Sequence, residues 1–127
     1  MNTVIIGLGS NINPGTNIEK ARALLGEKFR ILAESQFIKT KPLGPLKQPN
    51  FLNGAVLAVT PLDYDALRAK LKEIEKKMGR IVQIKNFGPR TIDLDILVWN
   101  NKVVDPDLYE RDFLRKSVLQ LIPELKF

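Results

Sequence analysis

Apolar and polar residues alternate along several short segments, and this period of two is typical of strands with one buried face. In the clearest of them, apolar residues occupy every second position from Ile92 to Ile96, and Asp93 and Asp95 lie between them. This pattern predicts a strand whose two aspartates point to the same side. Further strands are predicted at residues 3–9, 30–40 and 51–60, with a short extended piece at 103–104.

Apolar residues spaced three and four positions apart predict three amphipathic helices. Pro14 marks the start of the first, Asp63 can cap the second, and the third is expected from about Tyr109 to Leu121. The residues expected to face the core are Ile18, Ala21, Leu25, Phe29, Leu67, Leu71, Ile74, Met78, Phe113, Val118 and Leu121. The resulting order, β-α-β-β-α-β and a final helix, predicts an α+β fold.

The two aspartates are unusual in a strand, because aspartate is depleted there and like charges on one face repel. At a rise of about 3.3 Å per residue, their Cβ atoms are expected about 7 Å apart. Two carboxylates at that separation can share one hard cation or hold two cations that phosphates bridge. The alternative is a solvent-facing strand with incidental acids.

Composition narrows the chemistry that is available. The 127 residues form one domain, 1–127, and 44% of them are hydrophobic and 27% charged, as in soluble globular proteins. Without histidine or cysteine, the chain cannot build a Ser-His-Asp site, a thiol nucleophile or a Cys/His zinc site. No segment reads as a signal peptide or membrane helix, so we expect a cytoplasmic protein.

A net charge of +6 predicts a polyanionic partner, either a nucleic acid or a small phosphorylated ligand. Arg80, Lys85 and Arg90 flank the approach to the paired aspartates. Cations arranged around acids favour a metal-triphosphate site over a nucleic-acid surface, which needs no carboxylates at its centre.

Residues 41–50 carry three of the eight prolines, which predicts a loop between the second and third strands. Asn53 then lies in an otherwise apolar strand. A buried amide needs hydrogen-bond partners and suits the edge of a heterocycle, although an asparagine at a sheet edge that faces water is the alternative.

Residues 85–97, with Gly-Pro-Arg-Thr-Ile-Asp-Leu-Asp-Ile-Leu at their core, resemble the signature of the 6-hydroxymethyl-7,8-dihydropterin pyrophosphokinases. Two further blocks match the same family in the same order. They are Gly-x-Gly-Ser-Asn at 7–11, and Pro-Leu-Gly-Pro at 42–45 followed by residues 48–53. Residues 109–113 and 122–125 are a weaker block, so the resemblance runs from about Val4 to Leu125.

The resemblance implies a ferredoxin-like βαββαβ sandwich with an additional C-terminal helix. It also implies an enzyme that transfers diphosphate from ATP to the hydroxymethyl group of the pterin, releasing AMP, in folate biosynthesis. Magnesium, with two ions expected, would be the cofactor. Transfer of this kind rests on positioning and electrostatics, which need no histidine.

The resemblance further assigns roles to individual residues. The metal ligands would be Asp93 and Asp95, and the catalytic cations Arg80, Lys85 and Arg90. The pterin would contact Thr40, Leu43, Gly44, Phe51, Asn53 and Phe87. ATP would contact Glu75, Arg80, Arg90, Ile96, Asp105, Tyr109 and Arg111.

The chain departs from the family at several of these positions. Asp105 and Tyr109 stand where members usually carry histidine, and Phe51 and Phe87 replace a tyrosine and a tryptophan while keeping an aromatic face. Val82 replaces an arginine. A third alternative is a family member that binds its ligands without turning them over.

The resemblance also bears on partners. We expect a monomer that binds no nucleic acid or membrane, and fusion to or association with a folate-pathway enzyme is left open. The runner-up function is a basic ferredoxin-like module that binds RNA without catalysis. Phe51 and Phe87 argue against it, because they do not form the strand motif of RNA-binding sheets.

Overall fold

The computed structural model describes residues 1–42, 44–45, 47–79 and 91–127. In chain order its elements are β1 (Asn2–Ser10), α1 (Pro14–Lys28), β2 (Arg30–Glu34), β3 (Ile38–Thr40), β4 (Phe51–Thr60), α2 (Tyr64–Lys77), β5 (Asp93–Trp99), β6 (Lys102–Val103), the 3₁₀ helix η1 (Pro106–Tyr109) and α3 (Asp112–Leu121). This mixture of helices and one antiparallel sheet agrees with the α+β class expected from the sequence.

The sheet follows the order β2-β4-β1-β5-β6, and β3 pairs with β4 beyond the end of β2. Every pairing among the described strands is antiparallel. β1 and β4 form its centre and pair from Asn2 opposite Thr60 to Ser10 opposite Leu52. The continuous apolar sequence of β1 suits this place, because a central strand is covered on both faces.

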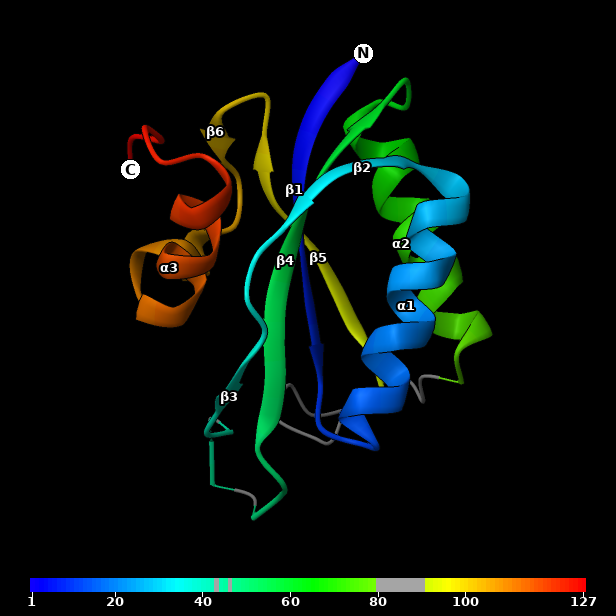
Figure 1. Ribbon diagram of the computed structural model, residues 1–127, viewed down its shortest axis with the longest axis vertical. Helices are drawn as coiled ribbons and strands as arrows, with labels where there is room; N and C mark the ends of the chain where they lie inside the picture. Colours follow the sequence, from blue (N-terminus) through cyan, green and yellow to red (C-terminus); the bar gives the residue numbers. More distant parts are fainter. Residues whose placement is uncertain (43, 46, 80–90) are drawn as a thin grey trace.

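Helices cover both faces of the sheet, as Figure 1 shows: α1 and α2 lie on one side and α3 on the other. Side chains that alternate along the strands therefore point into two separate hydrophobic cores, one on each face of the sheet. The core under α1 and α2 contains Val4, Ile6, Leu8, Ile18, Ala21, Leu25, Phe29, Val56, Ala58, Leu67, Leu71, Ile74, Ile92, Leu94 and Ile96. The core under α3 contains Ile5, Ala55, Leu97, Val98, Leu108, Val118 and Leu125.

A bulge in β5 sets which way its side chains point. Ile5 lies opposite Val98 and Ile6 opposite Ile96, so Leu97 is an extra residue in β5. Such an insertion changes the alternation of faces locally, and Leu97 and Val98 both join the core under α3. The aspartates of β5 lie on that same side, away from α1 and α2.

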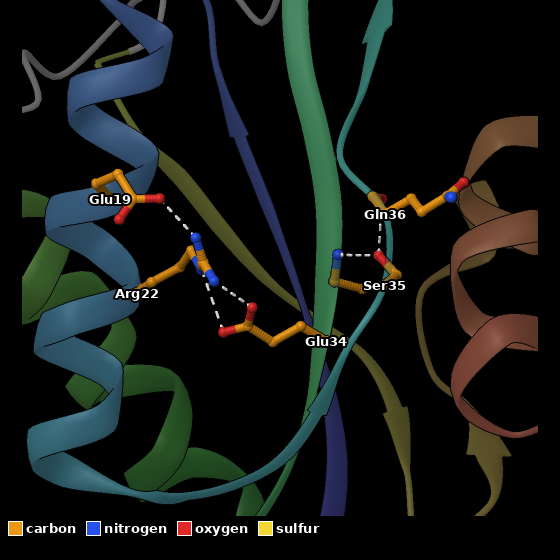
Figure 2. A network of polar contacts seen from close by, with 6 residues as sticks. Glu19, Arg22, Glu34, Ser35 and Gln36 are labelled. Atoms are coloured by element: carbon orange, nitrogen blue, oxygen red, sulfur yellow. Dashed lines mark hydrogen bonds and ion pairs between the residues drawn. The ribbon is translucent and has the colours of Figure 1, made fainter.

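The strand predicted over residues 30–40 is interrupted, and this corrects the sequence-based expectation. β2 ends before Ser35, whose backbone N–H donates to the Ala55 carbonyl (2.9 Å) while its hydroxyl accepts from the Ala55 N–H (2.8 Å). A side-chain oxygen thus takes the place of a backbone carbonyl in the ladder (Figure 2). The Gln36 N–H turns toward the other face and donates to the Gln120 side chain of α3 (2.8 Å).

α1 stabilises the same interruption from the opposite face. Arg22 reaches from α1 to Glu34 at the end of β2 and also bonds Glu19 one turn earlier in the helix (Figure 2). Its guanidinium carbon lies 5.9 Å from the centre of the Phe37 ring. That ring covers Gly54 so closely that a Cβ there would lie 2.5 Å from it, which explains why β4 carries glycine at this position.

The last helix begins later than predicted. Asp105 caps the turn before it by accepting from the Asp107 N–H (2.9 Å), and Pro106 at the first position favours the tight 3₁₀ helix η1. Arg111 is extended, so α3 starts at Asp112 and not at Tyr109. The chain therefore forms the short helix η1, and then an extended residue, before α3 packs onto the sheet.

Candidate active site

A cavity of about 460 Å³ lies between the sheet and the segment that carries η1 and α3. Its volume is typical of a small-molecule site. Elements far apart in the sequence meet here, since β3, β4, β5 and the turn after β6 all contribute. The predicted site residues that line it are Thr40, Phe51, Asn53, Asp93, Asp95, Asp105 and Arg111.

Two glycines of β1 form the floor of this cavity. Gly7 lies opposite Asp95 and Gly9 opposite Asp93, and directly opposed residues share a face of the sheet. A Cβ on Gly9 would lie 2.5 Å from the side-chain oxygen of Asn53, which reaches over the strand from β4. A Cβ on Gly7 would lie 3.0 Å from the Leu97 side chain, so glycine at these two positions leaves room for Leu97 and for the Asn53 amide.

Asn53 is held in one orientation. Its Nδ2 donates to the Thr40 hydroxyl across the β3–β4 pair at 2.5 Å, and its oxygen lies over Gly9. β4 pairs with strands on both sides at this point, so Asn53 does not lie at a sheet edge. The amide therefore presents fixed hydrogen-bonding groups to the cavity.

The pKa of one of the paired acids, Asp95, is strongly raised. Burial raises the pKa of Asp95 to about 8, and the neighbouring Asp93 adds to this by its charge and by a hydrogen bond. Asp105 and Glu75 contribute smaller repulsions. Asp95 therefore keeps a proton at neutral pH when no cation is present, and a bound cation would displace it.

The turn around η1 brings further charges to the same cavity. Burial raises the pKa of Asp105, while the hydrogen bond from the Asp107 N–H and the charge of Arg111 act in the opposite direction. Arg111 Nη2 lies 3.4 Å from Asp107 Oδ2. Among the residues that the structure describes, Lys41 and Arg111 are the cations that line the cavity.

Comparison with known protein families matches residues 5–123 to the family described as 7,8-dihydro-6-hydroxymethylpterin-pyrophosphokinase. The chain belongs to this pyrophosphokinase family. The 2-amino-4-hydroxy-6-hydroxymethyldihydropteridine pyrophosphokinase of Haemophilus influenzae is 33% identical over 138 residues, covering 98% of this chain and 84% of that protein. The protein of the same name from Aquifex aeolicus is 37% identical over 134 residues, covering 98% and 83%.

Some relatives in the pyrophosphokinase family are larger proteins. The mitochondrial folate synthesis bifunctional protein of Pisum sativum is 37% identical over 129 residues, covering 94% of this chain but 25% of that protein. Family membership does not favour the RNA-binding alternative. The cavity agrees with this, because its aspartates would repel a nucleic-acid backbone.

A smaller hollow of about 220 Å³ adjoins the cavity along the outer side of β5. Asp95 and Asp105 line both spaces, and Ile96 lines the hollow together with Tyr64 and Arg68 of α2. Of the residues that the pyrophosphokinase resemblance assigned to ATP, Ile96 and Asp105 therefore lie side by side here. The shared aspartates connect the two spaces.

Other predicted residues lie outside these spaces. Glu75 is 2% exposed and accepts a hydrogen bond from the Leu94 N–H (2.7 Å), so it satisfies a backbone donor of β5 beyond the end of β6. It also pairs with Lys72 at 3.4 Å. Tyr109 is exposed and its ring contacts Phe127, and Gly44 lines neither space. Their roles stay predictions.

Five predicted site residues lie outside the described parts of the chain: Leu43, Arg80, Lys85, Phe87 and Arg90. The structure adds others that the sequence patterns did not single out. Phe113 was expected in the core, but it is only partly buried and lines the cavity from the first turn of α3. Lys41, Gln48 and Asp107 line it as well. Gly7 and Gly9, which stand out in the sequence only as part of a block shared with the family, also line the cavity.

Proposed function

We propose that this protein transfers diphosphate from ATP to the hydroxymethyl group of 6-hydroxymethyl-7,8-dihydropterin and releases AMP, a step of folate biosynthesis. One observation carries the proposal: a single cavity combines paired carboxylates with a fixed amide and an aromatic ring, which suit a metal-phosphate group and a heterocycle respectively. Membership in the pyrophosphokinase family supports the same reaction.

Asp93 and Asp95 fit a magnesium site. Burial, and next to it the charge of Asp93, raise the pKa of Asp95, and a cation bound between the two carboxylates would offset both effects. In the described parts of the chain, no three potential metal-ligating side chains converge, so the remaining ligands would be phosphate oxygens and water. This is the usual way in which Mg²⁺ is held beside ATP. Bound there, two Mg²⁺ ions would neutralise the phosphates and fix their orientation.

The pterin would occupy the main cavity. Asn53, held by Thr40, would form hydrogen bonds with the edge of the heterocycle, while Phe51 offers a ring for stacking and Phe87 is expected to add a second. The partly buried Phe113 contributes a further aromatic wall. These groups orient the ring and exclude water, and so hold the hydroxymethyl group near the aspartates.

ATP would lie across the boundary between the two spaces. The base and ribose would occupy the hollow beside Ile96, and the phosphates would extend past Asp105 toward the paired aspartates. Arg80, Lys85 and Arg90, with Arg111, would neutralise charge on the transferred group. The pterin alcohol oxygen would bond to the β-phosphorus and lose its proton to solvent as the bond between the β-phosphorus and the α,β-bridging oxygen breaks. AMP would leave with that oxygen.

The strand order and the two helices packed on one face support a ferredoxin-like fold for this domain. We propose a monomer that recognises no nucleic acid. The bifunctional relatives support an association with another folate-pathway enzyme. In the described residues, no helix is both long and apolar enough to cross a bilayer.

Incubation with the pterin alcohol, ATP and magnesium, followed by chromatographic detection of AMP, tests the proposal. Equal amounts of AMP and pterin diphosphate are expected. ADP as the product would indicate transfer of a single phosphoryl group and would contradict it. Binding of both ligands without AMP would instead identify a member that has lost turnover.

A further inference from the structure

The turn after β1 carries a buried amide that reaches into the proline-rich segment. Asn11 is 2% exposed, and its Nδ2 donates to Gln48 Oε1 at 2.8 Å and to the Pro49 carbonyl at 3.1 Å. Both N–H groups of one side chain are therefore used on neighbouring residues. Gln48 lines the cavity, and Phe51, which also lines it, follows two residues after Pro49.

Local hydrogen bonds fix this donor in place. The Ser10 hydroxyl donates to the Ile12 carbonyl at 3.1 Å, and Asn17 Nδ2 donates to the same carbonyl at 2.5 Å. Asn13 adopts a left-handed conformation (φ 41°) before α1 begins. The turn is thus tied to both β1 and α1, so Asn11 holds its partners against a fixed support.

The position of Asn11 explains why a side chain is needed to connect the end of β1 to the proline-rich segment. The β1–β4 ladder ends with Ser10 opposite Leu52, and beyond it the returning segment contains Pro49, which has no backbone N–H. Asn11 continues the connection between the two segments by donating to the carbonyl of that proline. Aspartate is similar in size but cannot replace it, because a carboxylate has no N–H to donate.

We propose that Asn11 is a positioning residue for the pterin pocket: it fixes Gln48 and the chain leading to Phe51 before the ligand arrives. The inference rests on the proposed function. The two ends of the proline-rich segment are then held independently, one through Thr40 and Asn53 and the other through Asn11. A wall that is fixed in advance loses less conformational freedom on binding, so affinity depends on these contacts.

Calorimetric titration of Asn11→Ala with the pterin alcohol and with Mg-ATP tests this role. The dissociation constant for the pterin should rise about tenfold, equivalent to about 1.4 kcal/mol, while that for Mg-ATP stays within about twofold. In turnover, KM for the pterin should rise more than kcat falls. Asn11→Asp should not restore binding. Asn50→Ala, an exposed amide in the same segment, is the matched control and should behave like the parent.

A double-mutant cycle with Gln48→Met separates positioning from a general loss of stability. Methionine keeps the volume but removes the acceptor, so if Asn11 acts through Gln48, the double variant should bind the pterin little worse than Asn11→Ala alone. Fully additive losses, or parent-like pterin binding by Asn11→Ala, would overturn the inference. If Asn11→Ala does not fold, parent-like binding by Gln48→Met overturns it.

Pterin binding by the parent protein distinguishes a failure of the proposed function from a failure of the positioning role of Asn11. A parent that binds no pterin would refute the proposed function, and the positioning role would fall with it. A parent that binds pterin, beside an Asn11→Ala variant that binds it equally, would refute the positioning role alone.

Discussion

Replacing Asp95 with asparagine should stabilise the ligand-free protein at neutral pH while it removes turnover. In the folded protein the Asp95 carboxyl keeps its proton up to a pKa of about 8, because it is buried beside Asp93. In the unfolded chain the same group ionises near its model-compound value of 3.8. Between these values the unfolded state binds fewer protons, so the free energy of unfolding decreases as pH rises.

The magnitude follows from this interval. Neutral pH lies about three units above 3.8, and each unit corresponds to about 1.4 kcal/mol, which gives an upper value of about 4 kcal/mol. Water in the open cavity screens part of the interaction, so we expect asparagine to gain roughly 2 kcal/mol. AMP production by the same variant should fall by several orders of magnitude, because a ligand of the metal that holds the ATP phosphates is lost.

Urea unfolding of parent and variant from about pH 4 to pH 8 measures the effect. The two free energies should be similar at the acid end and separate as pH rises, with the variant more stable. Glu27→Gln, an exposed carboxyl on α1, serves as the control and should follow the parent at every pH. Parallel curves for the parent and Asp95→Asn would refute the claim that burial beside Asp93 raises the pKa of Asp95 in the folded protein.

Three further predictions concern the cavity. Asn53→Ala should weaken pterin binding by about 1–3 kcal/mol and leave Mg-ATP binding unchanged in calorimetry; equal loss of both ligands would show that the pocket is misplaced. Gly9→Ala should displace the Asn53 amide and lower pterin affinity about tenfold in the same assay. Gly26→Ala is the control: its added Cβ meets nothing within 4 Å, so it should be neutral or stabilise α1 by about 0.5–1 kcal/mol. Removal of divalent cations with a chelator should stop AMP formation, and added magnesium should restore it; undiminished turnover without the metal would contradict the assignment of Asp93 and Asp95.

The periodicity of the chain predicted the elements that matter most for the site. Alternation around Asp93 and Asp95 placed both acids on one face of a strand, and the structure confirms that both line one cavity. The helical spacing of apolar residues likewise identified the layer formed by α1 and α2. These features are local consequences of side-chain polarity, which a single sequence expresses directly.

Features that depend on distant partners could not be predicted in this way. Strand alternation continues through Ser35, and the separation of β2 from β3 is seen only in how each pairs with β4, with the Ser35 hydroxyl bonded to Ala55 between them. Phe113 fits a helical core pattern equally well whether it faces the interior or a cavity. The bulge at Leu97 depends on the register with β1, which the sequence of β5 does not encode alone.

The interruption at Ser35 also bears on whether the edge of the sheet can pair with another molecule. β2 and β3 form the outer edge of the sheet, where unpaired backbone groups can recruit a strand from another molecule. With five residues in β2 and three in β3, the edge is divided into two short pieces. Arg22 of α1 pairs with Glu34 at the end of β2, and Gln120 of α3 accepts a hydrogen bond from the intervening Gln36. An approaching chain therefore meets no long, straight ladder to extend, although the exposed Leu32 and Ile38 would otherwise favour aggregation along this edge.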